Sequence, residues 1–308
     1  MWLAGVRPAA EAHFVRHREG PMRHTLVFLA AAVALGVHRH PRQGSIVVGV
    51  LEQAQCSDDS SLMVRTLFRN ANSAWAPFPS PAAGATFKWT VAFDGHSLGT
   101  VTSREPQGSS DKAWKYPGDH LQQLERPVLA PHLANRRHQF AGWCGAPSLR
   151  PLVVVSEPNV GDPERWRPYT PDSTERRALF PYFRKVADTV YQCASIDAQA
   201  KRWQYRDRDL RFERSYISST GRKLIALGFN PAAYRCDGPP GPDWTAHWFY
   251  VATDTVYLGA EMELVDAGDY DRDGASEVLF WYSGYNEDGY TLFWDSFRRH
   301  VDFHWHYN

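Results

Sequence analysis

The sequence predicts a mainly β protein, with antiparallel sheets that form either a sandwich or propeller-like blades and with one or two short helices. Strand-like runs rich in β-branched and aromatic residues recur at about ten-residue spacing through the second half of the chain. The 308 residues also include 21 Pro, 22 Gly, 12 Trp, 14 Tyr and 16 Phe, a mixture that favours short strands and turns over long helices. No internal repeat is visible in the sequence, which weighs against the propeller arrangement.

The first 36 residues have the pattern of a leader that precedes the mature protein. From Met22, a basic start is followed by about a dozen apolar residues from Thr25 onward and then by small residues, as in a secretory signal peptide. We therefore expect residues 1–21 to be an upstream extension, the mature chain to begin near Val37, and the protein to be secreted or periplasmic. The apolar run is shorter than the roughly 20 residues that span a bilayer, so we expect no stable membrane insertion. The alternatives are an uncleaved anchor and a buried helix.

Four cysteines lie in the expected mature chain, and their even number and wide spacing indicate disulfides in an oxidising compartment. None of the spacings is CxxC, which argues against a zinc site built from these residues. Four cysteines allow three connectivities. We favour Cys56–Cys144 and Cys193–Cys236, because pairing within each half of the chain needs fewer long crossovers.

The first β-rich region, residues 37–160, contains a clear hairpin signal. The segment Phe87–Phe93 alternates apolar and polar residues, turns at Asp94-Gly95 and continues as Leu98–Thr102. Residues 103–139 are polar and are expected to form loops. The other strands expected in this region are Ser45–Val50, Leu62–Phe68 and Pro151–Ser156.

The second β-rich region, residues 161–308, begins with a helix and continues with strands. Asp172 and Glu175 form a capping-box pattern, and the residues from Ala178 to Val190 have helical apolar spacing. Because Pro181 lies inside that spacing, the helix is expected to kink or to begin again there. The strands expected after it are Trp203–Tyr205, Leu210–Ile217, Leu224–Phe229, Trp248–Val251, Val256–Leu264, Val278–Tyr282, Tyr290–Trp294 and Val301–Trp305.

One acidic loop in this second region carries a definite chemical signal. Three aspartates alternate along it, so a single curved loop can direct three carboxylates at one centre, and the glycine that follows permits a sharp turn. Hard oxygen ligands in this number favour Ca²⁺ over Mg²⁺, which prefers fewer protein ligands and a stricter octahedron. The alternative is an acidic surface turn that binds no ion. The candidate ligands are Asp269, Asp271, Asp273, the backbone carbonyl of Ala275, and Glu277.

Two types of calcium loop begin in this way. An EF-hand needs flanking helices and a bidentate Glu at its twelfth position, where this chain has Phe280. The flanks Met262–Val265 and Val278–Tyr282 are strand-like, so the loop is expected to join two strands. This segment of about 20 residues resembles the FG-GAP and VCBS repeats, the calcium-bearing β-hairpins of integrin-alpha-like propellers. The resemblance implies side-chain ligation by the four acidic residues, backbone ligation by Ala275, and a structural more often than a catalytic role for the ion.

The charge balance excludes some classes of function. The 34 Lys and Arg residues equal the 34 Asp and Glu residues, which argues against non-specific binding of nucleic acid or of an anionic membrane surface. The expected role is that of a binding or interaction module, which recognises a protein or a carbohydrate beside a loop stabilised by calcium. Whether the protein is an enzyme is left open by the sequence, which favours a non-enzymatic role.

The competing interpretation is a secreted serine hydrolase or esterase. The segment Gly95-His-Ser-Leu-Gly99 matches the G-x-S-x-G nucleophile elbow and is similar to the version found in lipases, with Ser97 as the nucleophile. An elbow needs a buried strand before the serine and a helix after it, whereas the flanks here predict a hairpin.

Two further groups of side chains have both a functional and a structural interpretation. His300, His304 and His306 lie in the last expected strand, where His304 and His306 share one face, so a transition-metal site is geometrically possible. We favour the alternative, a polar edge on an aromatic strand. Aromatic residues around the calcium hairpin could stack on sugars, although most are expected to be core: Trp281, Tyr282, Tyr285, Tyr290 and Trp294.

Overall fold

The structure is a computed structural model that describes residues 45–53, 62–79, 84–104, 121–124, 151–158, 160–192, 201–234 and 241–306. Residues 43–308 form one compact unit. The expected leader, residues 1–36, and all four cysteines lie outside the described residues, so the signal peptide and the disulfide pairing remain predictions. Within the described part of the chain, no helix is long and apolar enough to cross a bilayer.

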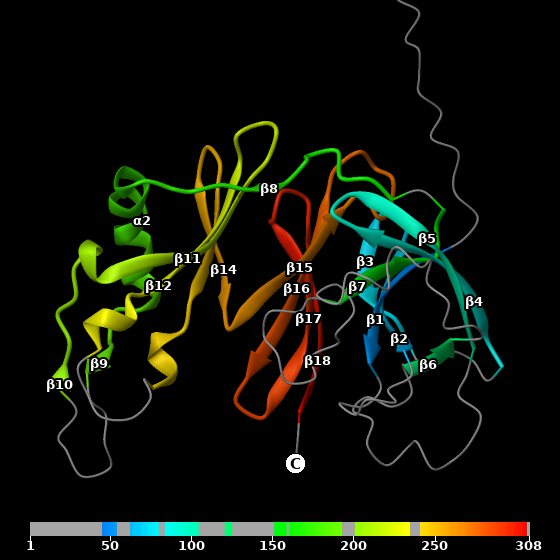
Figure 1. Ribbon diagram of the computed structural model, residues 1–308, viewed down its shortest axis with the longest axis horizontal. Coiled ribbons are helices and arrows are strands. Elements are labelled where there is room, and N and C mark those ends of the chain that lie inside the picture. The colour runs from blue at the N-terminus through cyan, green and yellow to red at the C-terminus, as the bar shows by residue number, and fades with distance from the viewer. Residues whose placement is uncertain are drawn as a thin grey trace, which may run out of the picture. The chain divides into compact units, whose positions relative to one another are not determined.

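The first half of the chain forms a seven-stranded antiparallel sheet in the order β1-β7-β4-β5-β6-β2-β3, in which β1 also pairs with β2 (Figure 1). Alternate residues of its strands, including Val47, Leu51, Trp89 and Val154, pack together in one apolar cluster. The strands are β1 (Ile46–Gln53), β2 (Leu62–Ala71), β3 (Ala74–Pro77), β4 (Thr86–Phe93), β5 (His96–Arg104), β6 (Leu121–Leu124) and β7 (Leu152–Val155).

A five-stranded antiparallel sheet follows, in the order β14-β13-β12-β11-β8, and the helix α2 (Ser173–Val186) packs on one of its faces. Leu179 and Phe183 of α2 join Ile225, Leu227 and Phe249 of the sheet in one buried cluster. The sheet strands are β8 (Arg167–Pro168), β11 (Leu210–Ile217), β12 (Lys223–Phe229), β13 (His247–Val251) and β14 (Thr255–Ala260); β9 (Tyr191–Gln192) and β10 (Lys201–Arg202) form a separate two-stranded ribbon.

A four-stranded sheet of sequential hairpins, β15 to β18, packs against both larger sheets (Figure 1). On one face, Trp281, Tyr290 and Phe303 are buried together with Val48 and Phe68 of the seven-stranded sheet. The opposite face contributes side chains such as Phe280 and Phe293 to a cluster with Trp248 of the five-stranded sheet. The strands are β15 (Met262–Gly268), β16 (Glu277–Gly284), β17 (Glu287–Trp294) and β18 (Arg299–His306).

The prediction of a mainly β fold with antiparallel sheets is confirmed, and the face-to-face packing of these sheets is compatible with the sandwich alternative. The helix begins as predicted, with Asp172 as N-cap and Glu175 completing a capping box, and it runs through Pro181 without a break. The two β-rich regions, 37–160 and 161–308, share one buried cluster at the four-stranded sheet.

Some predicted elements differ from the structure. The expected strand Trp203–Tyr205 is wrong: the backbone there is irregular, and the Trp203 and Tyr205 rings pack against Phe229 in the cluster that also holds the buried residues of α2. The expected strand Val256–Leu264 is two strands, β14 and β15, because the chain turns at Glu261, which has a left-handed φ of 58°. Residues 103–139 were expected to form loops, but they contain the end of β5 and the short strand β6.

Candidate metal centre

The acidic loop joins β15 to β16, so the prediction that it connects two strands is confirmed. The loop reverses direction through two residues in the left-handed region, Arg272 with a φ of 63° and Gly274 with a φ of 91°. A Cβ atom at Gly274 would meet nothing within 4 Å, so the glycine serves the backbone conformation and not a close contact. Because strands β15 and β16 flank the loop, it lacks the flanking helices of an EF-hand.

The three alternating aspartates come together as predicted. One carboxylate oxygen each from Asp269, Asp271 and Asp273 lies within 4.8 Å of the other two, an arrangement that can hold a metal ion. Backbone amides orient two of these carboxylates: Asp273 N donates to Asp271 Oδ1 at 3.1 Å, and Ala275 N donates to Asp273 Oδ1 at 2.8 Å. These hydrogen bonds hold the loop curled around the carboxylates.

The two carboxylate oxygens of Asp269 differ in their hydrogen bonding. Its Oδ2 accepts a hydrogen bond from Gly274 N at 3.1 Å, but its Oδ1 is buried and accepts none from the described residues. Burial raises the pKa of this carboxyl, the hydrogen bond from Gly274 N and other loop amides lower it in part, and the neighbouring Asp273 carboxylate raises it again. A buried carboxylate oxygen without a donor is costly in free energy, and a cation between the three aspartates would remove that cost.

Glu277 lies at the start of β16, where its side chain is only 2% exposed. Its Oε2 accepts a hydrogen bond from Tyr270 N at 2.7 Å, so the carboxylate faces back into the loop. Burial is the main reason that the pKa of Glu277 is raised well above its usual range, and the nearby Asp271 carboxylate adds to the shift. Glu277 thus neighbours the aspartate cluster, and its ligand role, like that of the Ala275 carbonyl, remains a prediction.

Hydrogen bonds connect the loop to residues far away in the sequence, which no sequence pattern had identified. Asn70 of β2 donates from Nδ2 to Asp271 Oδ2 at 2.7 Å, across 201 positions of sequence. Asp269 N donates to Gly161 O at 2.6 Å. No sequence signal could have found Asn70, because its role depends entirely on tertiary packing.

A second connection runs through Asp162, whose carboxylate organises the turn beside the loop. Ser276 Oγ donates to its Oδ1 at 2.6 Å, while Glu164 N and Trp166 N donate to Oδ1 and Oδ2 at 3.0 and 2.6 Å. An Asp before Pro163 is typical of a turn, so the turn itself could have been found in the sequence. Its contact with the acidic loop could not.

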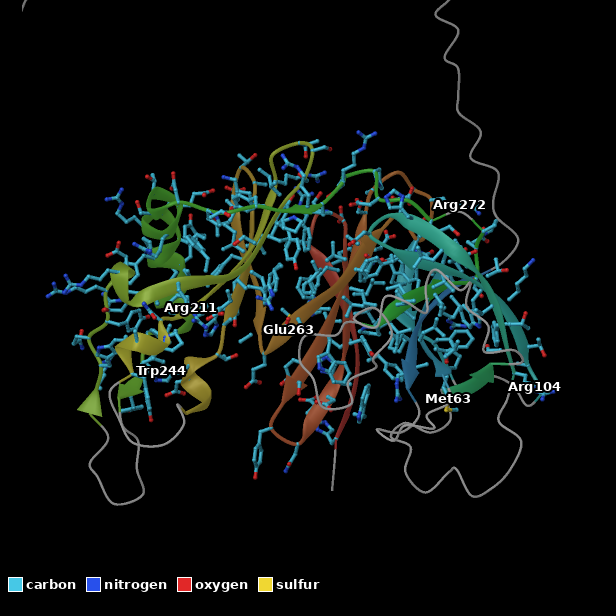
Figure 2. The ribbon with its side chains drawn as sticks, in the orientation of Figure 1. Met63, Arg104, Arg211, Trp244, Glu263 and Arg272 are labelled. Carbon is cyan, nitrogen blue, oxygen red and sulfur yellow. The ribbon has the colours of Figure 1, made fainter. Side chains whose placement is uncertain are left out.

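An open cleft of about 850 Å³ lies beside the loop. The loop supplies part of its wall, and the rest comes from the β4–β5 turn and from the segment around residue 163. Figure 2 labels Arg272 at this loop. Arg272 also forms an ion pair with Glu157, with Nη2 and Oε2 2.7 Å apart. The lining combines both charge signs with apolar groups: Asp94, His96, Asp162, Arg165, Arg167, Asp269 and Arg272 contribute to it together with Gly95, Val160, Gly161, Pro163 and Trp166.

Gly95 and His96 of the G-x-S-x-G segment also line this cleft, but the segment does not have the geometry of an elbow. Asp94 and Gly95, with φ angles of 47° and 71°, form the tight turn of the β4–β5 hairpin. Ser97 lies in β5 opposite Ala92 and is exposed, and a strand follows it where an elbow requires a helix.

The aromatic residues around the hairpin divide between core and surface. Trp281 and Tyr290 are buried in the cluster shared with the seven-stranded sheet, whereas Tyr285 is 93% exposed. Comparison of the chain with protein families, with curated proteins and with solved structures found no match.

Proposed function

We propose that this is a secreted or periplasmic binding protein in which Ca²⁺, held by the β15–β16 loop, stabilises one wall of the adjacent cleft. The cleft is the surface that recognises a protein or glycan ligand. The protein acts by binding, and the ion has a structural role.

The observation that carries the proposal is the buried Oδ1 of Asp269, which accepts no hydrogen bond from the part of the chain that the structure describes and lies beside two further carboxylates. Such a cluster of hard oxygens suits Ca²⁺, which accepts flexible, oxygen-rich coordination. Glu277 and the Ala275 carbonyl would complete the shell in the manner of the FG-GAP and VCBS loops that this segment resembles.

The position of the loop supports a link between the ion and recognition. Asp269 and Arg272 belong to the loop and also line the cleft. Without a cation, repulsion between the carboxylates would loosen the same backbone that shapes this wall. Calcium would therefore order the binding surface without contacting the ligand.

Thermal unfolding of the full chain with calcium and with EDTA tests the metal site. Extracellular calcium modules bind with dissociation constants of about 10⁻⁴–10⁻³ M, so about 10 mM calcium should add roughly 1.4–2.7 kcal/mol to the free energy of unfolding. The variant Asp271→Ala should lose this calcium-dependent stabilisation. A wild-type melting temperature that is the same in calcium and in EDTA would overturn the proposal.

Recognition is tested separately by glycan-array and pull-down binding in calcium and in EDTA. Arg165, an exposed residue of the cleft, is replaced in the variant Arg165→Ala, and Arg206→Ala is the control on an exposed arginine outside the lining. We expect wild type and Arg206→Ala to bind the ligand in calcium and to lose it in EDTA. We expect Arg165→Ala to lose binding even in calcium. Ligand capture that ignores both calcium and Arg165 would place recognition elsewhere on the molecule.

A further inference from the structure

A second group of metal-ligating side chains lies on the outermost strand of the four-stranded sheet, away from the acidic loop. Along β18, residues His300, Asp302, His304 and His306 alternate with the buried residues of the strand and so share one face. In the register with β17, His306 lies opposite Glu287, and His304 lies opposite Gly289.

The imidazole of His304 is held in one orientation. Its ring stacks on Tyr282 with centroids 4.5 Å apart and an angle of 10° between planes. Gly289 of β17 pairs with both Tyr282 and His304 and has no side chain. A Cβ atom at Gly289 would lie 2.3 Å from His304 Cδ2 and 2.5 Å from the Phe303 carbonyl oxygen. Glycine at this position therefore makes room for the ring.

The hydrogen bonds around His304 also determine which ring nitrogen is free. Thr291 Oγ1 donates its proton to Asp302 Oδ1 at 2.7 Å and lies 3.2 Å from His304 Nε2. Because the hydroxyl proton is already committed to the carboxylate, the hydroxyl can only accept, so Nε2 carries a proton. This chain of carboxylate, hydroxyl and imidazole is the type of outer shell that orients histidine ligands in metal sites.

The remaining nitrogen, His304 Nδ1, faces a carboxylate. It lies 3.3 Å from Glu287 Oε1, and His306 Nε2 lies 3.7 Å from the same oxygen. Two lone pairs that face each other require a cation between them, which is either a proton or a metal ion. In a tetrahedral zinc site with bonds of about 2.0–2.1 Å, ligand atoms are roughly 3.3–3.4 Å apart, which the separation of His304 Nδ1 from Glu287 Oε1 matches. The three ligand atoms do not yet all lie within 4.8 Å of one another, so the exposed His306 ring has to turn toward the ion to complete the site.

We propose that His304 Nδ1, His306 Nε2 and the Glu287 carboxylate form a binding site for a transition-metal ion, with Zn²⁺ as the fitting metal. Neutral imidazole suits borderline ions such as Zn²⁺, whereas Ca²⁺ requires oxygen ligands, so the two sites select different metals. The His306 side chain is 74% exposed and free to close on the ion. Three protein ligands leave the fourth position of the zinc ion open to water or to a ligand atom.

Isothermal titration of the tag-free full chain with zinc chloride, in saturating calcium, tests this proposal. Wild type should bind one zinc ion, and His306→Ala and Glu287→Gln should each lose that binding. The matched control is His300→Ala, on the same strand face but with its ring nitrogen 3.8 Å from Asp302 and no contact with Glu287. Zinc binding of this control should equal that of wild type.

A variant in the outer shell separates ligation from a simple ion pair. Thr291→Val removes the hydroxyl that orients His304 and should weaken zinc binding roughly 10–100-fold. Circular dichroism and melting temperature, measured for every variant, confirm that each is folded before its binding is compared. The proposal is overturned if wild type binds no zinc, if His306→Ala binds it as tightly as wild type, or if His300→Ala loses it equally.

Discussion

The hydrogen bond between Asn70 and the acidic loop gives a prediction that depends on the presence of calcium. In Asn70→Ala, Asp271 Oδ2 loses a donor that lies 2.7 Å away and belongs to a side chain only 7% exposed. A hydrogen bond to a charged group contributes about 1.5–3 kcal/mol, and the lower end applies because this pair is partly buried. Without calcium, the variant should therefore be about 1.5 kcal/mol less stable, with a melting temperature roughly 3–6 °C lower.

With calcium, the same substitution should cost more. In the proposed calcium site Asp271 is a ligand, and Asn70 would orient its carboxylate. Loss of such a neighbour typically weakens metal binding by about 10–100-fold, which is about 1.4–2.7 kcal/mol of linked stability when calcium is saturating for wild type. The total loss in calcium should thus reach about 3–4 kcal/mol, roughly two to three times the loss without it.

The assay is urea unfolding of wild type and Asn70→Ala, each in EDTA and in calcium, which yields four free energies of unfolding. Arg69→Ala is the control, because Arg69 is the exposed neighbour on the same strand. Its effect should be small and the same in both conditions. If Asn70→Ala costs the same free energy with and without calcium, then Asn70 supports only the fold and the reasoning about the metal is refuted.

Three further predictions concern other sites. Burial and the Asp271 carboxylate raise the pKa of Glu277 above its value in the unfolded chain, so the charged form of Glu277 destabilises the metal-free protein. In EDTA, Glu277→Gln should therefore have a higher melting temperature than wild type, and the difference should grow as pH rises. Saturating calcium should make wild type the more stable of the two. Gly289→Ala should cost about 1–3 kcal/mol in urea unfolding because its Cβ would meet backbone atoms, whereas Gly241→Ala, which meets nothing within 4 Å, should change little. Burial lowers the pKa of His247 to about 4, so on acidification the unfolded chain takes up this proton before the folded protein does. His247 alone should therefore cost wild type about 3 kcal/mol of stability as pH falls from 7 to 4. His247→Phe should remove that part of the pH dependence, and an unchanged slope of stability against pH would contradict the prediction.

Local sequence signals predicted the elements that depend on local physics. The alternation of Phe87–Phe93 and the Asp94-Gly95 turn gave the β4–β5 hairpin, and the Asp172 capping box gave the first turn of α2. The spacing of the three aspartates predicted that their carboxylates would meet, since alternate residues of a curled loop point to its centre. Each of these depends on residues within a few positions of one another.

Tertiary interactions explain what the sequence could not predict. Trp203 and Tyr205 have strand-forming character, but the Tyr205 ring packs on Phe183 of α2 and the Trp203 ring stacks on Trp244, and this packing overrides the preference of the backbone. At the turn between β14 and β15, the left-handed residue is Glu261, two positions after Gly259, so the glycine did not mark the position of the turn. Asn70 has no motif at all, because its function as a donor to Asp271 arises only when sheets from opposite parts of the chain pack together.

The burial of the four-stranded sheet on both faces has a consequence for biosynthesis. Each larger sheet completes one of its apolar clusters with side chains from strands β15 to β18, which the ribosome makes after all the others. Until these strands emerge, Phe68 on one side and Trp248 on the other have no apolar cover from this sheet. During synthesis, the seven-stranded sheet therefore lacks this apolar cover from its last strand at residue 155 onward, and the five-stranded sheet lacks it only from about residue 260, until strands β15 to β18 pack against both.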